Sequence, residues 1–369
     1  MRRRDWLKAT GALGAATTAA GAMSDSSPDL RLSTVRLQLR HTWTTTMSSS
    51  EYRDTIYAHY EAEGVRGIGE GAPIVRYGED AARARAALLG ARDLVRAADP
   101  WSTERLLGSA FARIGPQYAA RAALDIAVHD WTGKRLGVPV YRLLGLDPRD
   151  APLTTFSIGI DTPEVTRRKV REAAEFPVLK IKVGLDTDEA TIEAVRSVTD
   201  KPLRVDANEG WTDRDTAARR IEWLVSRGVE LVEQPMPAAM IEETRWLRER
   251  FGVPIFADEA CLRASDIPAL AEAYDGVNIK LDKAGGMREG LKMIHVARAC
   301  GLKVMLGCMI SSSVSTTAAA HLSPLVDFAD LDGNLLIAND PWSGVQVVEG
   351  RLILPAGAGL GLEPRAPAA

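Results

Sequence analysis

Val-Leu-Lys-Ile-Lys-Val-Gly, residues 178–184, reads as a β-strand that runs into a loop. Successive side chains of a strand point to opposite faces, so Lys180 and Lys182 share one face and the apolar residues share the other. Two ammonium groups on one apolar strand repel each other and resist desolvation, and both effects are expected to lower a lysine pKa from about 10.4. Lysines also protect exposed edge strands, but the apolar alternation and the final glycine favour a buried strand.

Short apolar runs of this kind recur about every 25 residues from residue 151 onward, with helical stretches between them. The runs lie at residues 155–160, 179–183, 203–206, 231–233, 255–257, 277–281, 303–306 and 328–331. The clearest helical stretches lie at 188–198, 212–227, 241–251 and 286–300. This alternation predicts an α/β fold, a (β/α)7β TIM-like barrel over residues 151–333, with its active site at the carboxyl ends of the strands.

Residues 29–150 predict a smaller α+β domain. Strand patterns at 29–40, 52–63 and 65–71, with a polar loop at 41–50, indicate an antiparallel sheet, and helical patterns follow at 80–98, 102–113 and 116–137. Asp125 and Asp130 in the last helix are interpreted as capping or pairing groups. The tail, residues 334–369, contains a strand pair at 345–354 and is expected to pack on this domain, so that the two together form a capping domain.

The composition excludes several classes of protein. A net charge of −3 offers no basic surface for nucleic acid, and 46% hydrophobic with 26% charged residues is typical of a globular chain. The three cysteines form no CxxC pair, so neither a zinc ribbon nor a disulfide framework is indicated. No apolar run is long enough to span a membrane in the mature protein.

The first 22 residues predict an export signal. Three arginines at positions 2–4 precede an Ala/Gly/Thr-rich run, which ends in Ala20-Gly-Ala22. The paired arginines resemble the twin-arginine type of signal, with cleavage after Ala22, and predict a periplasmic protein that is exported after folding. A basic first helix of the fold is the alternative. The run, however, has no apolar residues at the spacing of an amphipathic helix, and residues 23–28 form a Ser/Asp/Pro linker.

Three successive predicted strands each end in a carboxylate, namely Asp206, Glu233 and Asp258. A lone aspartate at a strand end is often only a helix cap. Three acids converging on one rim would repel one another unless a cation lay between them, and oxygen ligands without histidine or cysteine suit Mg²⁺. The sequence therefore predicts a magnesium site formed by these residues, called here the carboxylate trio.

Lys280 ends the sixth predicted strand, across the barrel from Lys182. A metal flanked by two opposed lysines is suited to removing a proton from a carbon next to a carboxylate, because the metal stabilises the enediolate and each lysine serves one face of the carbon. Lys283, in the loop before Gly285-Gly286, is interpreted as a pairing or solvated residue.

These motifs together resemble the enolase superfamily, muconate-lactonizing subgroup, over essentially the whole chain after the signal. The resemblance rests on Lys180-x-Lys182, the carboxylate trio, Asn278-Ile-Lys-Leu-Asp-Lys-Ala-Gly-Gly286 and Gly69-Glu-Gly-Ala-Pro73, which is similar to the capping-domain loop of the family. It implies one Mg²⁺ per subunit on the trio, an acid/base pair of Lys182 and Lys280, and a Lys180 that tunes Lys182 and contacts the substrate carboxylate. Asn208 and Glu259 are supporting residues, and a homo-oligomer is implied.

Asp330 and Asp332, on one face of the eighth strand, resemble the Asp-x-Asp pair of the dipeptide epimerases. In such an enzyme the aspartates hold the substrate ammonium group while the lysines invert the α-carbon of the C-terminal residue. Ala-Glu dipeptides of cell-wall peptide are the candidate substrate for an envelope protein. Ser311 is a departure, because many relatives have glutamate there, and it is counted among the supporting residues.

Other activities stay open at this stage. Within the superfamily they are o-succinylbenzoate synthesis, N-acyl amino acid racemisation and muconate cycloisomerisation, none of which has a substrate ammonium for Asp330 and Asp332 to bind. A non-catalytic periplasmic peptide-binding protein is the alternative from another class, although such a protein has no need of both lysines. The side chains accepted are not determined by the motifs, and the candidates to line their pocket are Arg40, Trp43, Arg53 and Arg76.

Overall fold

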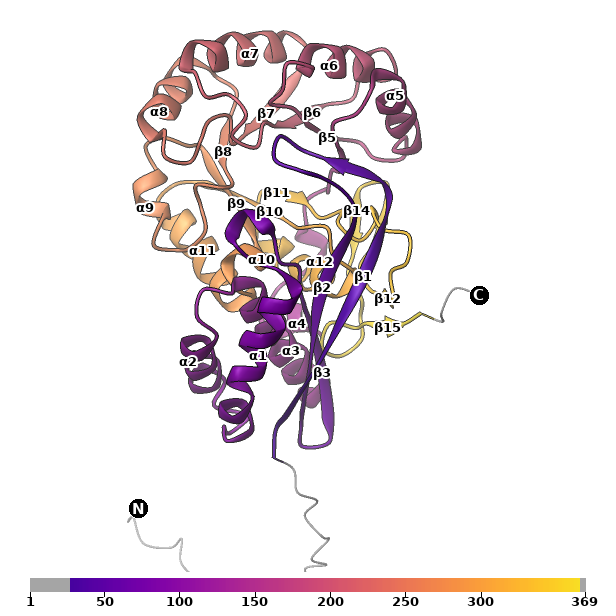
Figure 1. The fold of residues 1–369 in the computed structure, drawn as a ribbon, viewed down its shortest axis with the longest axis vertical. Helices are drawn as coiled ribbons and strands as arrows, with labels where there is room; N and C mark the ends of the chain where they lie inside the picture. Colours follow the sequence, from indigo (N-terminus) through magenta and orange to yellow (C-terminus); the bar gives the residue numbers. More distant parts are fainter. Residues whose placement is uncertain (1–26, 366–369) are drawn as a thin grey trace, which may run out of the picture.

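The computed structural model describes residues 27–365, and it confirms the predicted barrel with an α+β capping domain (Figure 1). The export signal predicted for residues 1–22 lies outside the described residues and stays a prediction. Among the described residues, no helix combines the length and the apolar character that crossing a membrane would require.

The capping sheet consists of β1 (Asp29–Thr44), β2 (Ser49–Ala62) and β3 (Val65–Gly71) in antiparallel order. The predicted loop at 41–50 is wrong in its length, because pairing resumes after a register shift with Trp43 opposite Ser50 and Thr44 opposite Ser49. Threonine and tryptophan favour strands, and the shift allows the ladder to continue. The hairpin tip consequently reaches the barrel mouth near β5 (Figure 1), where Thr46 Oγ1 donates to the backbone oxygen of Asn208 at 2.9 Å.

The helices of the capping domain agree with the predicted ones. They are α1 (Ala81–Arg96), α2 (Thr103–Ile114) and α3 (Tyr118–Leu136), and the short α4 (Val140–Leu143) follows. A buried core between helices and sheet includes Tyr60 and Trp131, whose rings pack edge to face with centroids 5.7 Å apart. The motif Gly69–Pro73 begins inside β3 rather than in a loop, and only Ala72 and Pro73 leave the strand.

The barrel is an eight-stranded parallel sheet in sequential order, from β4 to β11. Its strands are β4 (Phe156–Ile158), β5 (Leu179–Lys182), β6 (Leu203–Asp206), β7 (Val229–Glu233), β8 (Ile255–Ala257), β9 (Gly276–Lys280), β10 (Lys303–Gly307) and β11 (Phe328–Asp330). A parallel bridge from Thr154 to Ala329 connects the last strand to the first. All eight lie where the apolar runs predicted them.

Helices cover the outside of this sheet (Figure 1). They are α5 (Pro163–Glu172), α6 (Asp188–Arg196), α7 (Arg214–Ser226), α8 (Ile241–Arg250), α9 (Ile267–Leu270), α10 (Leu281–Ala284), α11 (Met287–Ala299) and α12 (Ser313–Ala320). Inside the barrel, a cluster of Leu231, Phe256, Met305 and Phe328 fills the amino-terminal half. The guanidinium of Arg204 packs on the Phe328 ring, 4.8 Å from its centroid, while the aspartates, glutamate and lysines predicted for the site lie toward the carboxyl ends of the strands, where a TIM barrel carries its site.

The tail packs on both parts of the molecule. It contributes β12 (Trp342–Ser343), the predicted hairpin β13 (Gln346–Val348) and β14 (Arg351–Ile353), and β15 (Glu363–Pro364). Arg40 N donates to Leu336 O at 2.9 Å, and Leu360 N donates to Asp130 Oδ1 at 2.7 Å, so the tail contacts the capping domain as expected. The hairpin instead contacts the barrel, where Thr154 N donates to Gly350 O at 2.8 Å.

Asp125 and Asp130 have the structural roles predicted for them. Asp125 Oδ1 accepts a hydrogen bond from Met287 N, the first residue of α11, at 2.6 Å and so caps that helix from α3. Asp130 accepts hydrogen bonds from Ile68 N and from the Lys134 ammonium. Both buried carboxylates thus join segments that are distant in sequence.

Candidate active site

Strand register brings the predicted site residues to one level of the barrel. Lys182 pairs with Asp206, and Asp206 pairs with Glu233, across three neighbouring parallel strands. On the other side of the barrel, Gly307 pairs with both Lys280 and Asp330. Because side chains at one level of a parallel sheet point the same way, these residues all face the barrel axis.

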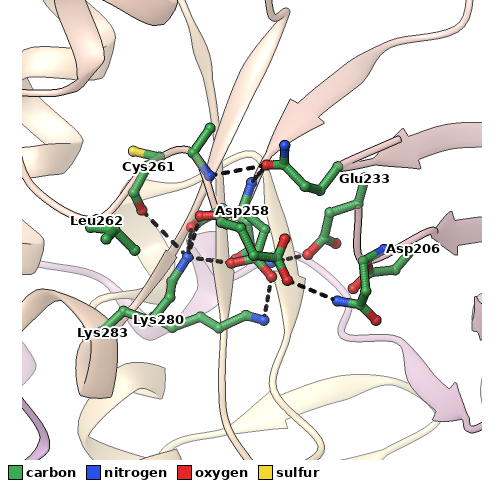
Figure 2. A network of polar contacts seen from close by, with 12 residues as sticks. Asp206, Glu233, Asp258, Cys261, Leu262, Lys280 and Lys283 are labelled. Atoms are coloured by element: carbon green, nitrogen blue, oxygen red, sulfur yellow. Dashed lines mark hydrogen bonds and ion pairs between the residues drawn. The ribbon is translucent and has the colours of Figure 1, made fainter. Parts of the chain in front are cut away.

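The carboxylate trio comes together as predicted (Figure 2). Asp206, Glu233 and Asp258 are buried, and each places one oxygen within 4.8 Å of the others. Burial, together with the charge of Asp206, raises the pKa of Glu233 to about 8, so the three negative charges disfavour one another. A buried all-oxygen set of three carboxylates fits a hard divalent cation such as Mg²⁺.

The two lysines proposed as acid and base contact different members of the trio. Lys182 Nζ lies 2.5 Å from Asp206 Oδ2, and Lys280 Nζ lies 2.6 Å from Asp258 Oδ2. They come from β5 and β9, on opposite sides of the strands that carry the trio. A small molecule above the trio would therefore have one lysine on each side.

Lys180 lies at the centre of the carboxylates. Its ammonium group is 2.7 Å from Asp330 Oδ2, 2.8 Å from Glu233 Oε2 and 3.1 Å from Asp206 Oδ2. Lys180 also lines the site cavity, where a substrate could reach it. Its contact with a substrate carboxylate stays a prediction.

The expected lowering of the lysine pKa on this strand is wrong for Lys180, and the pKa of Lys280, for which no shift was predicted, is also raised. Burial acts to lower both values, but neighbouring carboxylates outweigh burial and raise the pKa of each well above its ordinary value. Asp330 contributes most at Lys180, and Asp258 contributes most at Lys280. The positive charge of Lys180 also acts to lower the pKa of Lys280. This repulsion is smaller than the attraction of Asp258, because the Lys280 ammonium group contacts that carboxylate directly.

Lys283 is a pairing residue, and its solvated alternative is wrong. It lies buried in α10 rather than in a loop, and its ammonium group contacts the Asp258 carboxylate and donates to Asp258 O at 2.7 Å. Burial would raise the pKa of Asp258, but Lys280 and Lys283 hold it well below its ordinary value. Lys283 thereby keeps this carboxylate ionised and in place (Figure 2).

Amide side chains position the trio. Asn208, predicted as a supporting residue, donates from Nδ2 to Glu259 Oε1 at 3.1 Å and from its backbone N to Asp206 Oδ1 at 2.9 Å. Asn278, for which no site role was predicted, donates from Nδ2 to Glu233 Oε1 at 2.8 Å. Its position two residues before Lys280 on a strand would have placed it on the same face.

Two further features near the trio were also missed. Gln234 Oε1 accepts hydrogen bonds from Asp258 N at 2.9 Å and from Ala260 N at 3.1 Å, which fixes the end of β8. Gly307 leaves room for Asn278, because a Cβ at this glycine would lie 2.6 Å from Asn278 Oδ1. Neither role follows a periodic pattern in the sequence.

Asp330 and Asp332 lie side by side in the same cavity as the lysines. Asp330 is fully engaged, because it pairs with Lys180 and accepts from Thr155 Oγ1 at 2.5 Å and Ser157 Oγ at 3.2 Å. Asp332 Oδ2 accepts one hydrogen bond, from Ser157 N at 2.6 Å. Burial, and then the charge of Asp330, raises the pKa of Asp332 to about 7, so a cation beside Asp332 would be stabilised there.

Ser311 lies beside the cavity wall rather than in it. It is buried, and its Oγ lies 3.3 Å from Thr316 Oγ1 in α12. The residues of this segment that line the cavity are Cys308, Met309 and Ile310.

The site cavity, of about 520 Å³, lies between the barrel mouth and the capping domain. Trp43, Arg53 and Arg76 line it, as the sequence analysis suggested. Arg40 instead lines an adjoining cavity of about 440 Å³, whose walls are mostly apolar. A pocket of this size, with lysines and carboxylates fixed at its base, suits a small molecule with two or more charged ends.

Comparisons with known proteins agree with this geometry. Residues 30–145 match the mandelate racemase/muconate lactonizing enzyme N-terminal domain, and residues 164–369 match the enolase C-terminal domain-like family. The chain is 44% identical over 327 residues to the L-Ala-D/L-Glu epimerase of Bacteroides thetaiotaomicron, covering 88% of this chain and 85% of that protein. It is 40% identical over 344 residues to the L-Ala-D/L-amino acid epimerase of Pedosphaera parvula, covering 89% and 97%.

A solved structure is similar throughout the fold. The dipeptide epimerase of Enterococcus faecalis, complexed with Mg and the dipeptide L-Leu-L-Tyr, superposes with a TM-score of 0.85 at 32% identity, covering 90% of this chain and 98% of that one. Both domains match models of one family, and the two relatives named first are 40% or more identical over most of the chain. The chain belongs to the mandelate racemase/muconate lactonizing enzyme family of the enolase superfamily.

Proposed function

We propose that the protein is a Mg²⁺-dependent dipeptide epimerase that inverts the α-carbon of the C-terminal residue of its substrate. The observation that carries the proposal is the pair of ammonium groups, Lys182 and Lys280, which contact the trio from two opposite strands of the barrel. An inversion needs a proton acceptor on one face of the carbon and a donor on the other.

Asp206, Glu233 and Asp258 would hold the Mg²⁺. The fit rests on their buried oxygens, which lie within 4.8 Å of one another, and on the raised pKa of Glu233, which burial and then the charge of Asp206 cause. When bound, the metal would supply positive charge for the enediolate and offset the carboxylate charge that raises the pKa of Lys280.

The lysines then do the proton transfer. One lysine, in its neutral form, removes the α-proton of the C-terminal residue, and the other, as an ammonium group, returns a proton to the opposite face. Because the two lysines exchange roles for the reverse direction, either epimer serves as substrate. Lys283 and Asn278 keep Asp258 and Glu233 in place during the cycle.

Asp332 is the group that favours a free dipeptide over an acylated amino acid. Its buried carboxylate next to Asp330 would be stabilised by the N-terminal ammonium group of a dipeptide, whereas an acyl group carries no such charge. The N-succinyl Arg/Lys racemase of Bacillus cereus shares the fold, with a TM-score of 0.86 at 28% identity, so the fold alone does not separate the two activities.

Ala-Glu and related dipeptides of cell-wall peptide are the substrates that we propose first. The relatives with 44% and 40% identity are named for L-Ala-D/L-Glu and L-Ala-D/L-amino acid epimerisation. The export signal predicted for residues 1–22 would place the enzyme in the periplasm, where such fragments arise.

The test is exchange of the α-proton in heavy water. The purified protein is incubated with Mg²⁺ and a library of L-Ala-L-Xaa dipeptides, and deuterium incorporation and inversion at the C-terminal residue are followed by mass spectrometry and NMR. We expect exchange and inversion with dipeptides, their loss after metal chelation, and their recovery when Mg²⁺ is restored. Asp332→Asn should weaken turnover mainly through KM.

Two outcomes would contradict the proposal. If no dipeptide in the library exchanges its α-proton, the protein is not a dipeptide epimerase. If N-succinyl amino acids exchange while free dipeptides do not, and Asp332→Asn has no effect, N-acyl amino acid racemisation is the better assignment.

A further inference from the structure

Arg53 differs from the other cations of the site cavity in having no acidic partner among residues 27–365. The cavity is lined by five cationic side chains, and four of them contact a carboxylate within the described residues. These four are Arg76 with Glu209, Lys180 with Asp330, Lys182 with Asp206, and Lys280 with Asp258. In the part of the chain that the structure describes, the Arg53 guanidinium donates only to the backbone oxygen of Tyr52, at 3.0 Å.

The side chain of Arg53 extends from β2 toward the barrel mouth. Arg53 lies directly opposite Leu37 in the β1–β2 pair, so both side chains share one face of the capping sheet. Leu37 on that face is buried against Ile310, which lines the site cavity at the end of β10. The guanidinium is therefore held on the roof of the cavity, above the lysines and the trio.

The nearest acid in sequence does not neutralise Arg53. Asp54 points to the other face of the strand, where it binds Arg36 through two hydrogen bonds of 2.8 and 2.9 Å. Burial lowers the pKa of Arg53, with no neighbouring acid acting to raise it. A half-buried guanidinium with most of its donors unused favours an incoming carboxylate, because the planar fork of arginine matches the two carboxylate oxygens.

The geometry of the inverted carbon shows which part of a substrate would meet Arg53. This step rests on the proposed function. The α-carbon has four substituents: its carboxylate is directed to the trio, its nitrogen toward Asp330 and Asp332, and its hydrogen toward Lys182 or Lys280. The fourth substituent, the side chain of the C-terminal residue, is left to point out of the barrel toward the capping sheet.

We infer that Arg53 is a specificity-determining residue that binds the side-chain carboxylate of the C-terminal residue, so that the preferred substrates are dipeptides ending in glutamate or aspartate. The ion pair forms equally in both epimers, because the side chain points out of the barrel in either configuration. It contributes to binding rather than to the proton transfer.

The experiment compares L-Ala-L-Glu with its uncharged isostere L-Ala-L-Gln in heavy water. We expect the wild-type protein to prefer L-Ala-L-Glu. In Arg53→Gln, kcat/KM for L-Ala-L-Glu should fall by about 10- to 100-fold, mainly through KM, while L-Ala-L-Gln changes by less than about twofold. Arg53→Lys should retain part of the preference, and Arg53→Glu should shift it toward L-Ala-L-Lys.

The matched control is Arg31→Gln, on the same strand pair. Arg31 is exposed and pairs with Glu61, so this variant should leave both substrates unchanged. Thermal melting of each variant verifies that the capping sheet is intact. L-Glu-L-Ala tests the position of the acidic residue, and a preference for it over L-Ala-L-Glu would overturn the assignment.

The outcomes also separate this inference from the proposed function. If dipeptides exchange but L-Ala-L-Gln is as good a substrate as L-Ala-L-Glu, or if Arg53→Gln slows both equally, the role of Arg53 is overturned while the epimerase assignment stands. If no dipeptide exchanges at all, the proposed function fails and the inference fails with it.

Discussion

Lys182 and Lys280 are chemically alike but contact different carboxylates of the trio, Asp206 and Asp258. Each should therefore serve one face of the α-carbon. We predict that Lys182→Ala and Lys280→Ala each reduce inversion by about 10²- to 10⁴-fold, the usual contribution of a general base. Each variant should still exchange the α-proton of one epimer, and the two variants should retain opposite epimers, as measured by deuterium incorporation from pure L,L and L,D substrates.

The control for these variants is Lys292→Ala, which removes an exposed lysine on α11 and should leave both exchange and inversion unchanged. Because each active-site variant leaves a buried carboxylate with one cation fewer, its melting temperature and Mg²⁺ binding are measured in parallel. Retention of the same epimer by both variants would contradict the assignment of one lysine to each face.

The contact between β3 and α3 depends on glycine at every second position of the strand. Gly67, Gly69 and Gly71 face Ala127, Ala123 and Ala119, and a Cβ at any of these glycines would overlap the backbone oxygen of the alanine opposite. Two strand residues advance about 6.7 Å and four helix residues about 6 Å, so the two repeats stay in step. The helix can lie directly on the strand backbone only while these positions lack a side chain.

We predict that Gly69→Ala lowers the free energy of unfolding by about 2–3 kcal/mol, because the added methyl group would force α3 away from the sheet. Gly90→Ala is the matched control: Gly90 lies in α1 with open space around its Cα, so the same change should raise the stability by about 0.5–1 kcal/mol. Urea denaturation measures both. If both variants change the free energy of unfolding equally, the close approach of α3 to β3 does not require glycine at position 69.

Buried carboxylates join the capping domain to the barrel across the whole molecule. Glu70 of β3 accepts hydrogen bonds from Ser312 N at 3.0 Å and from Ser315 N at 3.1 Å, at the start of α12. Asp282 of α10 accepts from Ala72 N at 2.7 Å. Burial raises the pKa of Glu70, and burial raises that of Asp282 to about 7.

Stability should consequently fall as the pH rises through this range. The folded state keeps a proton on Asp282 up to about pH 7, whereas the unfolded chain loses it near pH 4, so the contribution of this group is lost between these values. We predict that Asp282→Asn gains about 1–3 kcal/mol relative to the wild type between pH 4 and pH 7, measured by urea denaturation at several pH values. The control is Asp215→Asn, at an exposed position, whose free energy of unfolding should change with pH in parallel with that of the wild type. If the free energy of unfolding of Asp282→Asn also runs parallel to the wild type, the prediction is contradicted.

Local periodicity and strand order were sufficient to derive the barrel and the main site residues. Strand alternation placed Lys180 and Lys182 on one face, and the parallel topology brought Asp206, Glu233, Asp258 and Lys280 to one rim, because every strand of such a barrel ends on the same side. The length of the β1–β2 hairpin was missed, since pairing across a register shift depends on the partner strand rather than on local composition.

Only the tertiary structure decided how the charges are paired. The sequence by itself determined which face of each strand the candidate site residues occupy, because strand side chains alternate. The burial of Lys283 against Asp258, the contact of Lys180 with three carboxylates and the absence of an acidic partner for Arg53 among the described residues were not foreseeable. Electrostatic interaction depends on distances and burial, which strand periodicity does not determine. For this reason a lowered pKa was expected on the strand of Lys180 and Lys182, whereas the folded molecule raises the pKa of Lys180.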